Sequence, residues 1–115
     1  MSEVENFESE VKLINFGKLD EIEIEKAKKI ISQGMKKIRN YGDFQLLKLN
    51  LRIHKHSTEY IHEIEGEVLI KNKKSFNSIV SDKNLYKAIS KVIDKLKNEI
   101  DHSFEKEITK NLKNK

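Results

Sequence analysis

Residues 44–56 show the most regular alternation of apolar and polar side chains in the chain. The order runs Leu47, Lys48, Leu49, Asn50, Leu51, Arg52, Ile53, His54. Successive side chains of a β-strand point to opposite faces, so this pattern predicts a strand with one buried and one wet face. An apolar sheet face must be covered by a second layer, which favours a two-layer fold.

Weaker sequence patterns on either side of this strand predict the remaining strands and helices. Alternation predicts further strands at 11–17, 60–71 and about 75–80. Apolar residues at helical spacing predict one helix over 20–42 and a longer one starting near Lys83, capped by Ser81 or Asp82. The order β-α-β-β-β-α predicts an α+β two-layer sandwich, with a four-stranded sheet and two helices packed on one face.

Length and composition limit what such a chain can be. At 115 residues it fits a single domain, which we place at 11–108 between an acidic arm (1–10) and a basic tail (109–115). There is no apolar run long enough for a membrane span, and the acidic first ten residues do not resemble a secretory signal. With no cysteine, the sequence predicts a cytoplasmic protein without disulfides.

Basic residues are gathered rather than scattered. The net charge is +4, but the first ten residues hold four acids and no base, and without them 23 bases face 15 acids, a net charge of +8. The stretch from Lys26 to Gly42 contains no acid and six bases: Lys26, Lys28, Lys29, Lys36, Lys37 and Arg39. Clustered charge of this kind attracts polyanions.

The final helix repeats the pattern. At about 100° per residue, one flank carries Lys87, Lys91, Lys95, Asn98 and His102, while Asp94 and Asp101 fall toward the other flank. If both helices cover one sheet face, their lysines lie together. The predicted RNA-binding residues are Lys28, Lys29, Lys36, Lys37, Arg39, Lys87, Lys91, Lys95 and His102. RNA is favoured over duplex DNA because no helix-turn-helix, basic zipper or zinc finger is present.

Other candidate sites have simpler explanations. His54 and His56 share a strand face near His62, but zinc would need a further ligand such as Glu63, and no cysteine is available. Glu63, Glu65 and Glu67 line one strand face, where we expect a wet surface rather than a cleft that raises a pKa. There is no phosphate loop or catalytic triad motif. We therefore expect no enzyme activity, metal, cofactor or small-molecule substrate.

The final helix resembles that of a known family. The patterns Tyr86-Lys87-Ala88-Ile89 and Ile93-Asp94-Lys95-Leu96, and the first helix ending before Tyr41-Gly42-Asp43, resemble the ribosome hibernation-promoting factor family, also called ribosome-associated inhibitor A or the sigma-54 modulation proteins. The likeness covers roughly residues 11–107, without the C-terminal domain of the family's long form. It implies a short-form factor that binds rRNA of the small ribosomal subunit, blocks the mRNA and tRNA channel and stops translation.

Two other interpretations remain open at this stage. A general double-stranded RNA binder would use loop lysines such as Lys73 and Lys74. A non-RNA interaction module would use the basic strips to meet an acidic protein, or the chain's own acidic arm.

Overall fold

The fold is known from a computed structural model, which describes residues 4–7, 10–41, 43–71 and 75–113, with side chains as far as residue 104. In chain order the strands are β1 (Val4–Phe7), β2 (Val11–Ile14), β3 (Phe44–His56), β4 (Glu59–Ile70) and β5 (Phe76–Asp82). The helices are a short 3₁₀ turn at Phe16–Lys18, α1 (Glu21–Ile38) between β2 and β3, and α2 (Leu85–Lys113) at the end.

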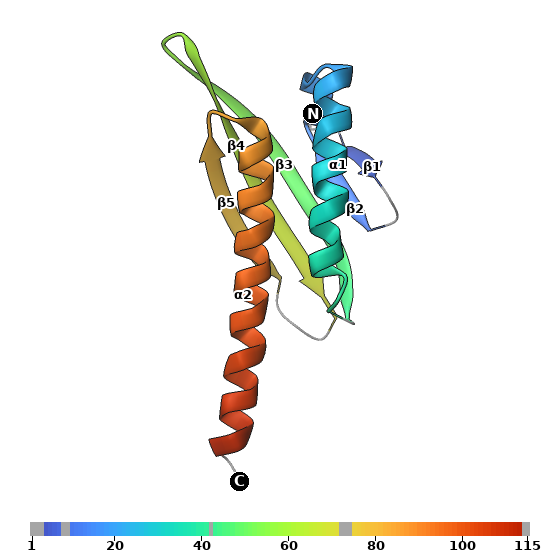
Figure 1. Cartoon of the computed structure of the whole chain (residues 1–115), viewed down its shortest axis with the longest axis vertical. Helices are drawn as coiled ribbons and strands as arrows, with labels where there is room; N and C mark the ends of the chain where they lie inside the picture. The colour runs from blue at the N-terminus through green and yellow to red at the C-terminus, as the bar shows by residue number, and fades with distance from the viewer. Residues whose placement is uncertain (1–3, 8–9, 42, 72–74, 114–115) are drawn as a thin grey trace.

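The five strands form one sheet in the order β1-β2-β3-β4-β5, with α1 and α2 side by side on one of its faces (Figure 1). β2 and β3 are parallel, and every other neighbouring pair is antiparallel. A parallel pair needs a long crossover connection, and α1 supplies it. The α+β class, and the two helices with their sheet, are therefore confirmed.

The predicted strand count was wrong by one. β1 forms inside residues 1–10 and pairs with β2 from Val4↔Ile14 to Phe7↔Val11. Four residues with two polar side chains carry almost no local strand signal. The strand forms because β2, the next strand along the chain, offers a free edge, and because Phe7 packs against the core.

The helix starts follow capping chemistry. In α1, Asp20 accepts a hydrogen bond from the backbone N–H of Glu23 (2.8 Å), and Glu23 accepts one from the N–H of Asp20 (3.2 Å). This reciprocal pair is a capping box. The predicted cap of α2 was wrong: Asn84 accepts from the N–H of Tyr86 (2.9 Å) and Lys87 (3.1 Å), and Asp82 instead accepts from the N–H of Asn84 (2.8 Å).

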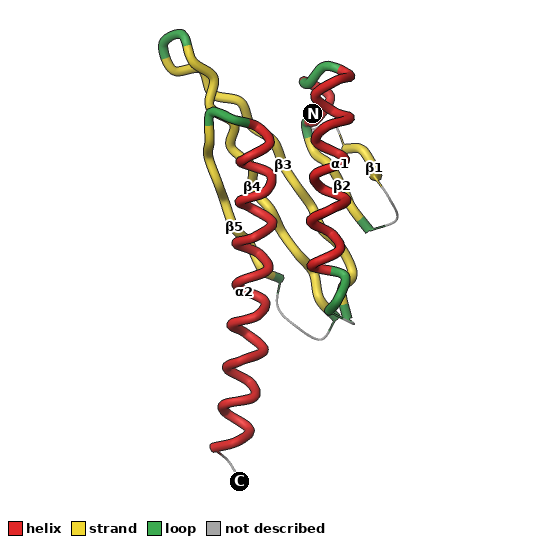
Figure 2. Tube along the Cα trace, in the orientation of Figure 1, coloured by secondary structure: helices red, strands yellow, loops and turns green. Residues whose placement is uncertain are grey.

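The two helices lie over the sheet (Figure 2), and the buried side chains of both layers form the core between them. Leu47, Leu49 and Leu51 of β3 are fully buried under the helices, as their alternation predicted.

The segment 109–115, expected as a tail, is helical as far as Lys113, and residues 114 and 115 lie outside the described residues. Over those residues, neither helix has an apolar stretch long enough to cross a lipid bilayer.

Two glycines set how closely α2 packs. A Cβ atom on Gly66 of β4 would lie 2.8 Å from Leu96 Cδ1 and 3.0 Å from Val92 Cγ2. A Cβ on Gly34 of α1 would lie 2.8 Å from Ile93 Cδ1. Because the two glycines leave room for side chains of α2, this helix packs directly on β4 and against α1. Gly66 is therefore a packing site and not a bulge, since pairing with β5 runs through it without a shift.

Candidate nucleic-acid interface

The lysine flank of α2 faces away from the core. Lys87, Lys91 and Lys95 are all exposed and follow one another at intervals of four residues, which is a rise of about 6 Å per step. The Nζ atom of Lys91 lies 2.7 Å from Asp82 Oδ2 at the end of β5. This contact, with the hydrogen bond from the Asn84 N–H, lowers the pKa of Asp82. Lys87 and Lys95 form no ion pair with any residue that the structure describes.

The α1 lysines divide into two groups. Lys29 and Lys36 are exposed, lie two helical turns apart, and have no ion-pair partner among the described residues. Lys28 points toward β1, where its Nζ lies 2.6 Å from Glu5 Oε1 and 5.3 Å from the centre of the Phe7 ring. Lys28 is thus neutralised by β1, whereas the outer face of α1 keeps its charge.

Arg39, at the end of α1, meets a second carboxylate from the N-terminal segment. Its Nε atom lies 3.1 Å from Glu10 Oε2. His102 is exposed on α2, seven residues beyond Lys95. It lies on the predicted flank, beyond the three lysines.

The two acids that the sequence places away from the lysine flank of α2 meet donors from α1 and from the turn after it. Asp94 Oδ1 is 3.3 Å from Lys37 Nζ of α1. Asp101 accepts hydrogen bonds from the Tyr41 hydroxyl and from Lys97 Nζ, the latter at 2.9 Å. These donors, Tyr41 first and Lys97 second, lower the pKa of Asp101. The two carboxylates therefore serve to join the helices and are already occupied by donors.

Aromatic and apolar side chains also line this seam. Tyr41 stacks on Phe104 with ring centres 5.5 Å apart, and Lys26 Nζ lies 5.9 Å from the centre of the Tyr86 ring. Burial, with the Asp101 hydrogen bond second, raises the pKa of Tyr41. A shallow groove of about 190 Å³ between the helices is lined by Ile30, Gln33, Gly34, Lys37, Ser90, Ile93 and Asp94.

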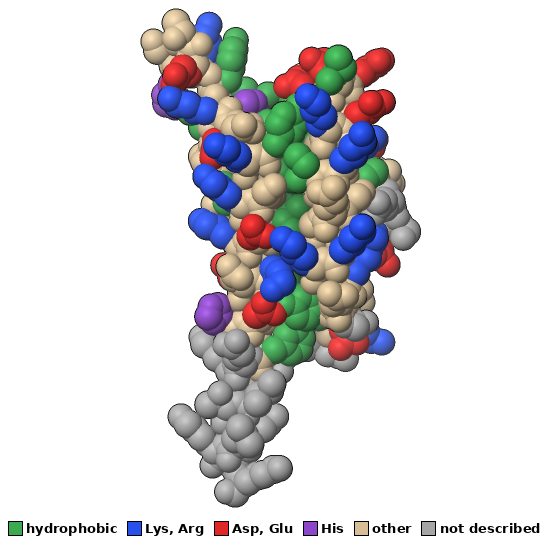
Figure 3. Space-filling model, viewed as in Figure 1, with side chains coloured by type: hydrophobic (Ala, Val, Ile, Leu, Met, Phe, Trp, Pro, Cys, Tyr) green, Lys and Arg blue, Asp and Glu red, His purple; other side chains and the backbone are tan. Residues whose placement is uncertain are grey.

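The helix face thus carries two columns of bases with a seam between them (Figure 3). The structure brings Lys29, Lys36, Lys87 and Lys95 onto this face without ion pairs among the described residues, and adds Lys37 and Lys91 in surface pairs. It moves Lys28 and Arg39 to the β1 side, in contact with Glu5 and Glu10. Nothing in the sequence pattern indicates those last contacts, because they depend on how β1 pairs.

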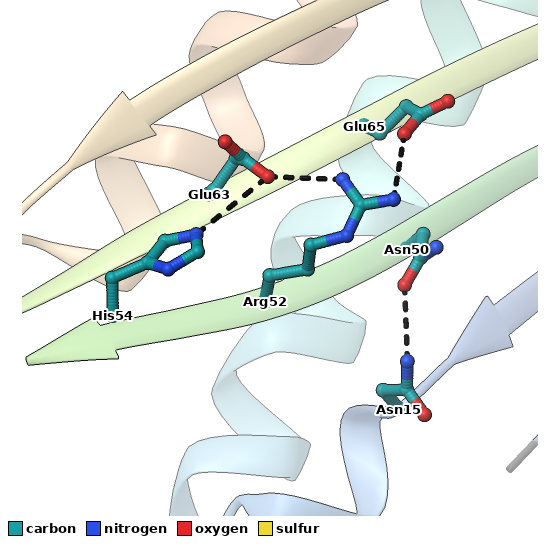
Figure 4. Close-up of polar contacts among 6 residues, drawn as sticks. All are labelled: Asn15, Asn50, Arg52, His54, Glu63 and Glu65. Atoms are coloured by element: carbon teal, nitrogen blue, oxygen red, sulfur yellow. Dashed lines mark hydrogen bonds and ion pairs between the residues drawn. The ribbon is translucent and has the colours of Figure 1, made fainter. Parts of the chain in front are cut away.

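The uncovered face of the sheet is also rich in charge, and on β3 and β4 these charges are paired (Figure 4). Arg52 reaches Glu63 at 2.9 Å and Glu65 at 3.1 Å, and Lys48 lies 3.5 Å from Glu67. The Arg52 guanidinium lowers the pKa of Glu63, so this carboxyl is held ionised rather than poised to donate a proton.

The histidines on this sheet also have ordinary contacts. His54 Nε2 lies 3.8 Å from Glu63 Oε2, and His62 Nδ1 is 2.9 Å from the Lys83 carbonyl oxygen. Among the side chains that the structure describes, no group of three or more His, Asp or Glu residues is arranged to hold a metal ion.

No protein-family model matches the chain, and no curated protein matches its sequence.

Proposed function

We propose that this chain binds structured RNA through the helix face, and that its target is the rRNA of the small ribosomal subunit. One observation carries the proposal: Lys29, Lys36, Lys87 and Lys95 are exposed on one face and meet no carboxylate within ion-pair distance among the described residues. Ammonium groups in this state bind phosphates without first giving up a protein partner.

The surface ion pairs on this face are weak barriers to RNA. Lys37 and Asp94 are both more than half exposed, and exposed pairs contribute only about 0–1 kcal/mol. A phosphate can therefore replace Asp94 beside Lys37 at small cost. Asp82 beside Lys91 is only 18% exposed and is held more firmly. Together these six lysines offer a two-column surface suited to an RNA backbone, in which side chains contact phosphates and 2′-hydroxyl groups.

The resemblance to ribosome hibernation factors is the reason for proposing the small ribosomal subunit as the target. Packing in the core explains many of the residues that carry this resemblance. Ala88, Ile89, Ile93 and Leu96 of the α2 motif are buried in the core. The proposed RNA contacts of the motif are therefore Lys87 and Lys95, which are two of its exposed residues. The proposed mechanism is steric: the domain occupies the channel of the small subunit and excludes mRNA and tRNA.

Sedimentation with purified small ribosomal subunits across a salt series tests this proposal. We expect saturable, stoichiometric binding whose logarithm falls linearly with the logarithm of salt, by about 0.7–0.9 per phosphate contacted. Equal affinity for any duplex RNA would instead favour a general double-stranded RNA binder. That interpretation relies on Lys73 and Lys74, which lie outside the described residues.

A non-RNA interaction module is the second candidate, and one observation favours it. Glu5 and Glu10 bind Lys28 and Arg39 of α1, so an acidic segment already meets part of the basic surface. If neither subunits nor RNA bind at low salt, where phosphate contacts are strongest, this candidate replaces the first.

A further inference from the structure

β5 is an edge strand without the usual protection. It pairs with β4 and ends the strand order, so alternate N–H and C=O groups along its outer side have no strand partner among the residues that the structure describes. Its sequence, FNSIVSD, contains no lysine or proline, and its register with β4 has no bulge. These are the features that usually prevent an edge from pairing with another chain. At its centre, Ile79 is 55% exposed.

A basic groove runs beside this edge. It has a volume of about 440 Å³ and lies between β5 and α2, lined by Ile79, Val80, Ser81, Lys91, Asp94, Lys95 and Asn98. Lys95 supplies an ammonium group without an ion pair among the described residues, and the Lys91 ammonium lies 2.7 Å from Asp82 Oδ2 of β5. The one carboxylate in the lining, Asp94, is engaged by Lys37. An edge strand next to a helix-walled groove is the arrangement in which a domain accepts an added peptide strand.

The pairing register predicts the side chains of such a strand. Val80 is buried on the helix side of β5, whereas Ile79 pairs with Glu65 and belongs to the uncovered face. Residues of an added strand would alternate in the same way. Those on the helix side would lie near Lys91 and Lys95, and those on the other side would lie beside Ile79.

We propose that β5 accepts an extended peptide of a partner protein as a sixth strand, with acidic side chains toward Lys91 and Lys95 and apolar side chains beside Ile79. A peptide is favoured over RNA here because only a peptide backbone matches the repeating N–H and C=O groups of a strand edge. A second copy is disfavoured, since pairing β5 with itself would bring two α2 lysine flanks together. The proposal goes beyond RNA binding and does not depend on it.

The test uses the full chain, labelled with ¹⁵N, and a capped peptide of alternating glutamate and valine with the length of β5. We expect saturable binding that shifts the amide signals of 76–82 and of Lys95. Two further peptides carry N-methyl groups on alternate backbone nitrogens, one on each edge, with unchanged charge. One of them should lose affinity by about tenfold or more, because its ladder hydrogen bonds are blocked, and the other should bind like the parent.

Variants separate this site from the RNA surface. Lys91→Glu with Lys95→Glu should weaken peptide binding about tenfold or more, and RNA binding as well, because both lysines also belong to the RNA surface. Lys29→Glu with Lys36→Glu should weaken RNA binding and leave peptide binding unchanged. Ile79→Asp, at an exposed position, should weaken peptide binding while the circular dichroism spectrum of the protein stays unchanged. The proposal is overturned if both N-methylated peptides bind like the parent, if no shift occurs along β5, or if an RNA oligonucleotide binds at β5 more tightly than the peptide.

Discussion

The uncovered face of the sheet and the outer face of the two helices both carry basic residues, but they differ in whether those residues have acidic partners. On the uncovered face, strand pairing sets Arg52 directly across from Glu63, and Lys48 across from Glu67, so the register itself creates the ion pairs. On the helix face, Lys29, Lys36, Lys87 and Lys95 have no such partner among the described residues. The number of basic residues on a surface therefore does not identify an interface. Acidic residues on a neighbouring strand can neutralise bases on a sheet, whereas the lysines on these helices have no such neighbours among the described residues.

The largest expected effect comes from reversing the helix-face lysines. Replacing Lys29, Lys36, Lys87 and Lys95 by Glu should reduce affinity for small ribosomal subunits by about a thousandfold or more, since each charged contact contributes on the order of 1 kcal/mol. The salt dependence of binding should also become shallower. Sedimentation across a salt series measures both.

The matched control reverses four exposed lysines that lie outside both helices: Lys12, Lys18, Lys55 and Lys71. It changes net charge by the same amount. If the control loses affinity as strongly as the helix-face variant, then overall charge, and not the helix face, drives binding.

The second largest effect comes from disturbing the packing of α2 on Gly66 of β4. Gly66→Val should destabilise the fold by about 1–3 kcal/mol, the usual cost of overpacking a core, because its side chain would overlap Leu96 and Val92. Urea unfolding measures the loss. Asn77→Val, at an exposed position of β5, is the control and should change stability by less than about 0.5 kcal/mol. An unchanged unfolding midpoint in Gly66→Val would contradict the close packing of α2 on β4.

The third effect comes from removing the acidic residues that neutralise basic side chains on the β1 side of α1. Glu5→Gln with Glu10→Gln removes the carboxylates that contact Lys28 and Arg39. RNA affinity should rise about two- to fivefold at low salt, as expected for exposed ion pairs. Glu59→Gln with Glu65→Gln removes the same charge away from the helices, so a similar rise in that variant would refute a local effect.

The smallest effect concerns the uncovered face. Arg52→Gln should leave RNA affinity unchanged but alter the dependence of stability on pH. Because Arg52 lowers the pKa of Glu63 in the folded state, their pairing stabilises the fold above the ordinary carboxyl pKa, and this contribution is lost as pH falls through the lowered folded value. Unfolding of wild type and variant should thus converge at acid pH. A variant whose deficit grows on acidification would show that this pairing has been misassigned.

Much of the fold follows from local periodicity. The alternation through Leu47, Leu49 and Leu51 predicted both the strand and the buried side of it. Apolar residues at helical spacing predicted α1, and Ala27, Ile31 and Met35, which share this spacing, are buried. The lysine flank of α2 was predictable for the same reason, since spacing along a helix fixes direction around its axis.

The sequence by itself therefore determined the α+β class, most of the elements, the core and the exposed directions of the helix lysines. Only the tertiary structure decided that Val4–Phe7 forms a strand, that Lys28 meets Glu5, that Lys37 meets Asp94, and that β5 leaves an open edge. The physical reason is range: periodicity is a property of adjacent residues, whereas an ion pair or a strand edge depends on which distant segments the folded chain brings within a few ångströms.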